Sequence, residues 1–281
     1  MTVKALIIFA SLCLLVLIWS CTEEITPPPS VTHPANWNTL SSAEFHGNKV
    51  KAVGYESCIT CHGSDYRGGS SGASCYACHD ETAGMEACNL CHGNSNASVS
   101  ALTSWAPPQD LMGDTVTTAT GVGAHQIHLS GDTWSTAYTR NCDICHATVT
   151  SFDDPDHIDK QEGIDVQFGQ SATWLGKLSP RWDHATASCS NTYCHGNFIF
   201  RKSASAIPDF YETDAMLGNN QEMVWTQAGS GQAACGSCHL LPPMGHIDVE
   251  VSCNNCHGAV VDADNHIIDK SKHINGYIDL N

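Results

Sequence analysis

Apolar residues are concentrated at the very start of the chain. An uncharged apolar run extends from Ala5 to Trp19, directly after Lys4. A bilayer-spanning helix needs about 20 such residues, and this run is shorter, as in the apolar part of an export signal. We therefore predict a signal peptide over residues 1–20.

Little of the remaining chain is periodic. Residues 164–168 alternate like a short strand, and we expect short helices where closely spaced cysteines are followed by histidine. Glycine is abundant, with 23 residues, and only 7% of residues are aromatic, so a conventional core would be thin. The pattern predicts mostly coil with short helices and minor strand, and an interior filled by something other than side chains.

The signal peptide is followed by a tether. The apolar run ends Leu-Ile-Trp-Ser before Cys21, which resembles a lipobox with Cys21 as the lipidated residue. Residues 27–29 are prolines, which favour an extended linker. We interpret residues 21–46 as a lipid-anchored tether and N-terminal arm. An ordinary cleaved signal or an uncleaved anchor are the alternatives. Thr22 after the cysteine favours the outer membrane, by resemblance to bacterial sorting rules.

The cysteines occur in pairs, and a histidine follows each pair. Apart from Cys13 in the signal peptide and Cys21, all cysteines belong to seven such motifs. Six have the spacing Cys-x-x-Cys-His, and the motif at 189–195 is stretched to Cys-x4-Cys-His. The pairs are Cys58 and Cys61, Cys75 and Cys78, Cys88 and Cys91, Cys142 and Cys145, Cys189 and Cys194, Cys235 and Cys238, and Cys253 and Cys256. The histidines are His62, His79, His92, His146, His195, His239 and His257.

This spacing is the one that attaches haem c. Two thiols add to the vinyl groups on one edge of the haem, and the next histidine reaches the iron as its proximal ligand. Zinc sites need four ligands and would not place histidine after the second cysteine seven times, and a disulfide framework needs no histidine. We therefore predict seven covalently bound haem c groups, and export agrees because this attachment occurs outside the cytoplasm.

Nine of the 16 histidines remain as candidate distal ligands, enough to close all seven irons with two left over. No spare histidine lies between His62 and His125, although three motifs do, so the chain must fold back across the haem stack. Methionine is the competing ligand and raises the reduction potential, but packing explains Met85, Met112, Met216, Met223 and Met244 better. The nine candidates are His33, His46, His125, His128, His157, His184, His246, His266 and His273.

The motifs divide the chain into two haem-binding units. We predict a trihaem unit over residues 47–95 and a tetrahaem unit over residues 96–281. The second contains an internal repeat, with copies at about 123–166 and 245–280. Each copy has histidine on both sides of its haem motif. Within it, His157 can correspond to His266 or to His273, and the sequence leaves this open.

Charge narrows the set of partners. The formal net charge is −17, which excludes nucleic acid as a partner because phosphate binding needs clustered Lys and Arg. We attribute the acidity to solubility.

The segment at 189–196, Cys-Ser-Asn-Thr-Tyr-Cys-His-Gly, followed by Cys-Gly-Ser-Cys-His at 235–239, resembles the CxxxxCH/CxxCH multihaem c-type cytochromes of metal-respiring bacteria. The resemblance covers roughly residues 120–281. It implies an electron carrier in the cell envelope that works with other redox proteins, such as cytochromes or a porin–cytochrome complex, and passes electrons toward an extracellular acceptor.

A relay of closed, low-spin haems is the function that we favour, because a saturated iron leaves no position for substrate. A multihaem reductase with one open haem is the first alternative. A subunit of a self-assembling cytochrome filament is the second.

Overall fold

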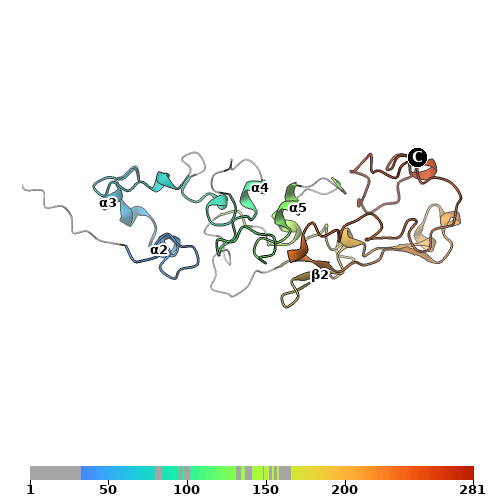
Figure 1. The fold of residues 1–281 in the computed structure, drawn as a ribbon, viewed down its shortest axis with the longest axis horizontal. Helices are drawn as coiled ribbons and strands as arrows, with labels where there is room; N and C mark the ends of the chain where they lie inside the picture. Colours follow the sequence, from blue (N-terminus) through green and yellow to red (C-terminus); the bar gives the residue numbers. More distant parts are fainter. Residues whose placement is uncertain are drawn as a thin grey trace, which may run out of the picture.

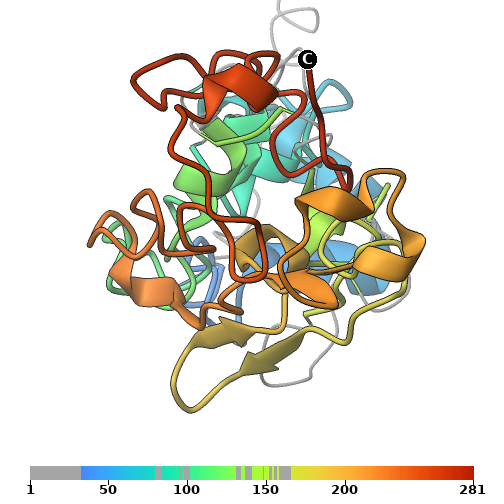
Figure 2. The same cartoon turned by 90° about the vertical axis from the view of Figure 1, so that its right-hand side faces the viewer.

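The computed structural model describes residues 33–79, 84–94, 97, 102–130, 134–136, 141–147, 149–151, 154, 157 and 166–281. The predicted signal peptide, the lipidation site Cys21 and the proline tether lie outside these residues. The molecule is elongated, and the chain runs along its long axis from the blue end to the red end (Figure 1). The end-on view shows loops arranged around this axis, with few regular elements (Figure 2).

The α-helices are short, and several of them form the haem motifs. They are α2 (His46–Val53), α3 (Ile59–His62), α4 (Leu102–Trp105), α5 (His125–Ser130) and α6 (Asn254–His257). Among the described residues, no helix has the length and apolar character needed to span a bilayer. Single 3-10 turns occupy Glu56–Cys58, Cys75–Ala77, Cys88–Leu90, Cys142–Ile144, Tyr193–His195, Lys202–Ala204, Pro208–Phe210 and Trp225–Gln227.

The strands are two or three residues long and lie around the stretched motif. They are β1 (Arg181–Asp183), β2 (Ser188–Ser190), β3 (Ile199–Arg201), β4 (Ala215–Leu217) and β5 (Met223–Val224). An antiparallel sheet has the order β1-β2-β5, with Trp182 opposite Cys189 and Cys189 opposite Met223. A second sheet pairs β3 with β4. The predicted content of mostly coil with short helices and minor strand is confirmed.

The expected strand at 164–168 is wrong in its described part. Residues 166–168 form no strand. The backbone N–H of Gln167 instead donates to the Cys145 carbonyl at 2.9 Å. The segment therefore packs against a haem motif and has no partner strand there.

The side-chain core is thin, as the composition predicted. Among the described residues, nine hydrophobic side chains are buried, and four of these are alanines. Val122 is the largest described side chain that is almost wholly buried, at 1% exposure. Burial of apolar side chains is the usual source of stability in a domain, so this fold depends on something else in its interior.

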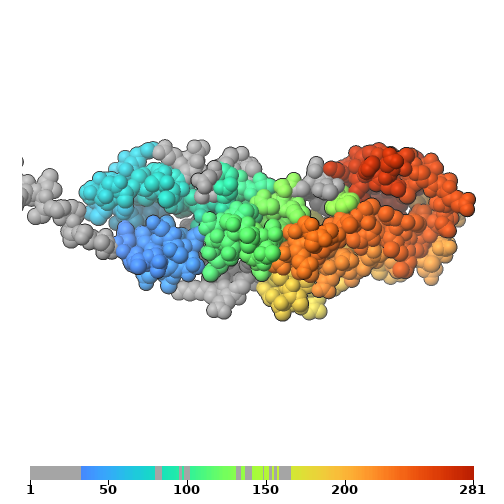
Figure 3. Space-filling view, viewed as in Figure 1, coloured from blue at the N-terminus to red at the C-terminus, as the bar shows by residue number. Residues whose placement is uncertain are grey.

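A single continuous cavity takes the place of a core. Its volume is about 3690 Å³, several times the roughly 300–1,000 Å³ of an ordinary ligand pocket. Its lining extends from His33 near one end to Asp279 near the other. Figure 3 shows part of the hollow between the red C-terminal segment and the orange segment before it. The interior is therefore shaped to hold several large groups along the length of the molecule.

Close backbone contacts join the stretched motif to the one after it. The backbone N–H of Asn219 donates to the Cys238 carbonyl at 2.8 Å, and that of Gln221 donates to the His195 carbonyl at 3.0 Å. Gly196 has a φ of +88°, and a Cβ on it would overlap the Cys238 carbonyl. Glycine is required here because both the backbone conformation and the space exclude a side chain.

We predict that Gly196→Ala lowers the free energy of unfolding more than Gly229→Ala does. Gly229 has a similar φ of +79° but open space around its Cα. Both variants therefore bear the cost of a non-glycine residue in the left-handed region, about 1–3 kcal/mol, and only Gly196→Ala must also displace the Cys238 backbone. Thermal unfolding of the two variants measures the difference. Equal losses would show that this close approach contributes nothing.

Candidate haem sites

Most of the motifs lie on a single helical turn. Three of the seven predicted proximal histidines end such a turn, three more lie two residues after one, and the motif at 235–239 lies in irregular turns. The fourteen motif cysteines form no disulfide with one another. Thirteen of them, all but Cys61, line the cavity, and so do all sixteen histidines.

Six proximal histidines each face a second histidine across the cavity. The separation of the ring centres is nearly constant, although the angle between ring planes varies from 16° to 77°. The pairs are His33 with His62 (5.9 Å), His46 with His79 (6.0 Å), His125 with His146 (6.2 Å), His128 with His195 (6.2 Å), His239 with His273 (6.3 Å) and His246 with His257 (6.3 Å).

This constant separation fits an ion between the rings. Atoms in direct contact lie about 3.5–4.0 Å apart, so parallel rings such as His125 and His146 at 6.2 Å leave a gap. With metal–nitrogen bonds of about 2 Å on both sides, and roughly 1.1 Å from each nitrogen to its ring centre, the ring centres lie about 6.2 Å apart. Direct contacts would vary with ring angle, whereas a shared ion fixes the spacing.

Backbone carbonyls hold the rings in the tautomer that iron requires. A carbonyl oxygen only accepts hydrogen bonds, so an Nδ1 beside it must carry the proton and leave the Nε2 lone pair available. Such a bond orients a ligand ring and raises its basicity. At His195 the buried Nδ1 has no partner within the described part of the chain. The bonds join His62 to Ala73 (2.7 Å), His92 to Trp105 (2.8 Å), His239 to Leu240 (2.8 Å), His257 to Asp279 (2.7 Å), His46 to Trp37 (3.0 Å), His125 to Val122 (2.8 Å), His128 to Ala124 (2.9 Å), His246 to Ile247 (2.7 Å) and His273 to Trp134 (2.7 Å).

Burial keeps several of these groups uncharged. It lowers the pKa of His125 and of His195 to about 4, so both rings are neutral at pH 7, as ligation requires. Burial, together with the neighbouring Cys189 and Cys194, raises the pKa of the Cys145 thiol to about 12. The stretched motif and the one before it are therefore close enough to sense each other's charge.

Helix α5 serves two sites at once. His125 and His128 lie one turn apart, and their ring partners belong to two successive motifs, at His146 and His195. Trp225 packs against both, edge-on to His125 with ring centres 4.8 Å apart and stacked on His128 at 5.6 Å. Its Nε1–H donates to the Thr120 carbonyl at 2.8 Å.

Sequence reasoning missed the role of Trp225, because a single tryptophan outside the motifs shows no pattern that would indicate its packing against two histidines. Gly123 is a signal that could have indicated this packing, because it leaves room for the indole. A Cβ on Gly123 would overlap the Trp225 ring.

The remaining three of the nine candidate distal histidines are placed in other ways. His184 accepts a hydrogen bond on Nδ1 from the Trp182 indole N–H at 3.1 Å. His266 has a side chain that is 76% exposed, and it bonds to Asp262 at 3.1 Å. His157 lines the cavity. His92 is the one proximal histidine that faces no second ring among the described residues.

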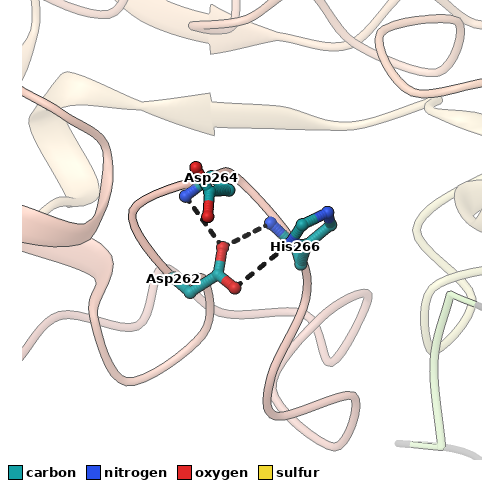
Figure 4. A group of neighbouring side chains, drawn as sticks. All are labelled: Asp262, Asp264 and His266. Carbon is teal, nitrogen blue, oxygen red and sulfur yellow. Dashed lines mark hydrogen bonds and ion pairs between the residues drawn. The ribbon is translucent and has the colours of Figure 1, made fainter.

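The His266 cluster does not resemble the paired sites. Figure 4 shows Asp262, Asp264 and His266 gathered on one exposed loop. Hydrogen bonds from the backbone N–H groups of His266 and Asp264 lower the pKa of the Asp262 carboxyl. The hydrogen bonds to Asp262 stabilise a turn in this loop, and this explains why the three side chains lie together.

The candidate methionines are placed differently from the paired histidines. Met216 is buried in β4 at 4% exposure, as packing predicts, and Met112 is 72% exposed. Met85 and Met223 line the cavity, and Met244 is 56% exposed.

These features define a class of protein before any comparison. Cysteine pairs followed by histidine, with opposed imidazoles along a large cavity, point to covalent binding of haem c. Residues 188–239 match the Geobacter CxxxxCH...CXXCH motif family, which agrees with a multihaem c-type cytochrome. Comparisons with curated proteins and with solved structures found no match.

The ring pairs predict which substitutions act on the same site. In the holoprotein, His46→Ala and His79→Ala should each change the absorption and electron paramagnetic resonance (EPR) of one haem, because each removes one side of the same gap. The double variant should still affect one haem, whereas His46→Ala combined with His246→Ala should affect two. Retention of haem in each variant is checked by mass. Two altered haems in the His46/His79 double variant would contradict the pairing.

Proposed function

We propose that the protein is a heptahaem c-type cytochrome that relays electrons through closely spaced haems, each ligated by two histidines, in the cell envelope. The observation that carries the proposal is the set of six imidazole pairs at 5.9–6.3 Å, each beside a cysteine pair, along one cavity. Haem iron supplies one-electron chemistry when bound, and the chain's residues determine where the electrons go.

Opposed histidines favour transfer over catalysis. Two imidazoles on one iron leave no position for a substrate, and imidazole ligation gives a lower potential than ligation by methionine. The backbone carbonyls that hold Nδ1, such as Ala73 for His62 at 2.7 Å and Asp279 for His257 at 2.7 Å, restrain the rings. Restrained ligands change little between oxidation states, which favours fast electron exchange.

The order of the motifs favours a continuous relay. Burial raises the pKa of the Cys75 thiol, and the nearby Cys58 raises it further. Burial also raises the pKa of the Cys194 thiol, and the nearby Cys238 raises it as well, by a smaller amount. Helix α5 and Trp225 connect the sites of His146 and His195. Successive motifs are therefore close to each other at three places along the chain, which supports transfer from site to site.

The location and partners are part of the proposal. Export, lipidation at Cys21 and the tether would place the haem domain at a membrane surface, on the outer membrane. The partners would be other redox proteins of the envelope, and electrons would pass toward an extracellular acceptor. These steps rest on the sequence of residues 1–46 and on the family resemblance.

The haem count tests the cofactor part of the proposal. Mass spectrometry of the exported holoprotein should show seven covalent haem groups, and Cys189→Ala with Cys194→Ala should show six, because the stretched motif binds one. Six groups in the unchanged protein, with no loss in the variant, would show that the stretched motif binds none.

Relay can be tested by following an electron inside the molecule. Flash photoreduction that delivers less than one electron per protein should be followed by redistribution among haems of different potential. If transfer runs along the cavity, the redistribution rate stays the same when the protein concentration is changed. A rate proportional to concentration would mean that electrons pass between molecules, which contradicts an internal relay.

A further inference from the structure

The two copies of the internal repeat place their upstream histidines in the same way. In the second copy, His246 faces His257, the proximal histidine of its own motif. In the first copy, His125 likewise faces its own His146. Each copy therefore places an upstream histidine against the proximal histidine of its own motif.

The segments after the two motifs also end alike. The Gln167 N–H donates to the carbonyl of Cys145, the second cysteine of the first motif, at 2.9 Å. The Asn281 N–H donates to the carbonyl of Cys256, its counterpart, at 3.0 Å. The loops at 147–166 and 258–280 thus begin and end at the same points of their motifs.

In the second copy, the loop at 258–280 places a histidine opposite the proximal histidine of the motif at 235–239. His273 lies in the loop and faces His239, which belongs to the motif before its own. The corresponding loop of the first copy contains one histidine, His157. The motif before the first copy is the one that ends in His92. Loop 258–280 contains two histidines, and His273 is the one that faces a proximal ring, whereas His266 bonds to Asp262. We therefore match His157 to His273, which relates His157 to His92 as His273 is related to His239.

The His92 site lies against the first copy. The Trp105 carbonyl of α4 holds His92 Nδ1 at 2.8 Å. The Gln126 amide of α5 donates to the carbonyls of Thr103, Ala106 and Pro107 at 2.9–3.1 Å, on both sides of Trp105. His92 is thus fixed next to the helix that carries His125. The cavity that His92 lines is also lined by His157.

The contacts of the other two candidates do not suit ligation. The Trp182 indole only donates, so His184 Nδ1 accepts, its proton is on Nε2, and that nitrogen has no lone pair for iron. His266 belongs to the exposed Asp262 loop of the second copy (Figure 4).

We propose that His157 is the distal ligand opposite His92, so that the haem site of Cys88 and Cys91 takes its second histidine from beyond the next motif along the chain. This inference rests on the proposed function, since it assumes a haem at that motif. It makes His157 the seventh distal ligand, and His184 and His266 the two histidines that ligate no iron.

The test is the spin state of holoprotein variants. The unchanged protein should be fully low-spin and should bind no carbon monoxide when reduced. His157→Ala should give one high-spin haem in seven and bind one carbon monoxide per molecule. The matched variants His184→Ala and His266→Ala should give none. His157→Met should restore the low-spin state with a raised potential at one haem, because methionine ligation raises the potential, and it shows that the fold survives.

A second pair of variants locates the effect. In a protein that carries Cys88→Ala and Cys91→Ala, and so lacks that haem, adding His157→Ala should create no high-spin haem. The inference is overturned by high-spin haem in the unchanged protein that His157→Ala leaves unaltered, or by an effect of His157→Ala that persists without the Cys88 haem. It is also overturned if His184→Ala or His266→Ala opens the site. A haem count below seven by mass would instead contradict the proposed function.

Discussion

The fold depends on holding pairs of imidazole rings about 6 Å apart across a space that the chain does not fill. Regular secondary structure contributes little to this, because helices and sheets consume their backbone carbonyls in their own hydrogen bonds. Coil leaves carbonyls available, and those of Ala73, Leu240 and Trp134 are used to hold Nδ1 of a histidine. The low content of helix and strand is therefore a requirement of the site. A chain of long helices would have fewer carbonyls to offer at these positions.

The sequence predicts the proximal half of each site and leaves the distal half open. Haem attachment needs two thiols and a histidine within five or seven residues, so the motifs can be recognised in the sequence without a structure. The ring partners are not local. His128 faces His195, 67 residues further on, and nothing in the pattern distinguished it from His125 as the ligand. The carbonyls that orient the rings cannot be read at all, since every residue has one.

Helix α5 illustrates how a small element can couple two sites. Side chains at i and i+3 lie on the same face of a helix, so His125 and His128 move together. Trp225 packs on both rings and is itself held by the Thr120 carbonyl. A change in either ring's orientation is therefore transmitted to the other through one packed indole. Independent helices would have separated the two sites, whereas a shared turn keeps them at a fixed spacing.

Two of the ring pairs join different motifs, and this bears on how a molecule with such a thin core can be stable. His273 faces His239 across a motif boundary, and His128 likewise faces the motif after its own. Each such pair closes a loop of chain when both rings bind one ion, and closing loops removes conformational freedom from the unfolded chain. Binding free energy then becomes folding free energy, as in small metal-binding domains. Because these two pairs link neighbouring motifs, the segments that carry them cannot separate without breaking a site, and this constraint adds to the little that the nine described buried apolar side chains supply.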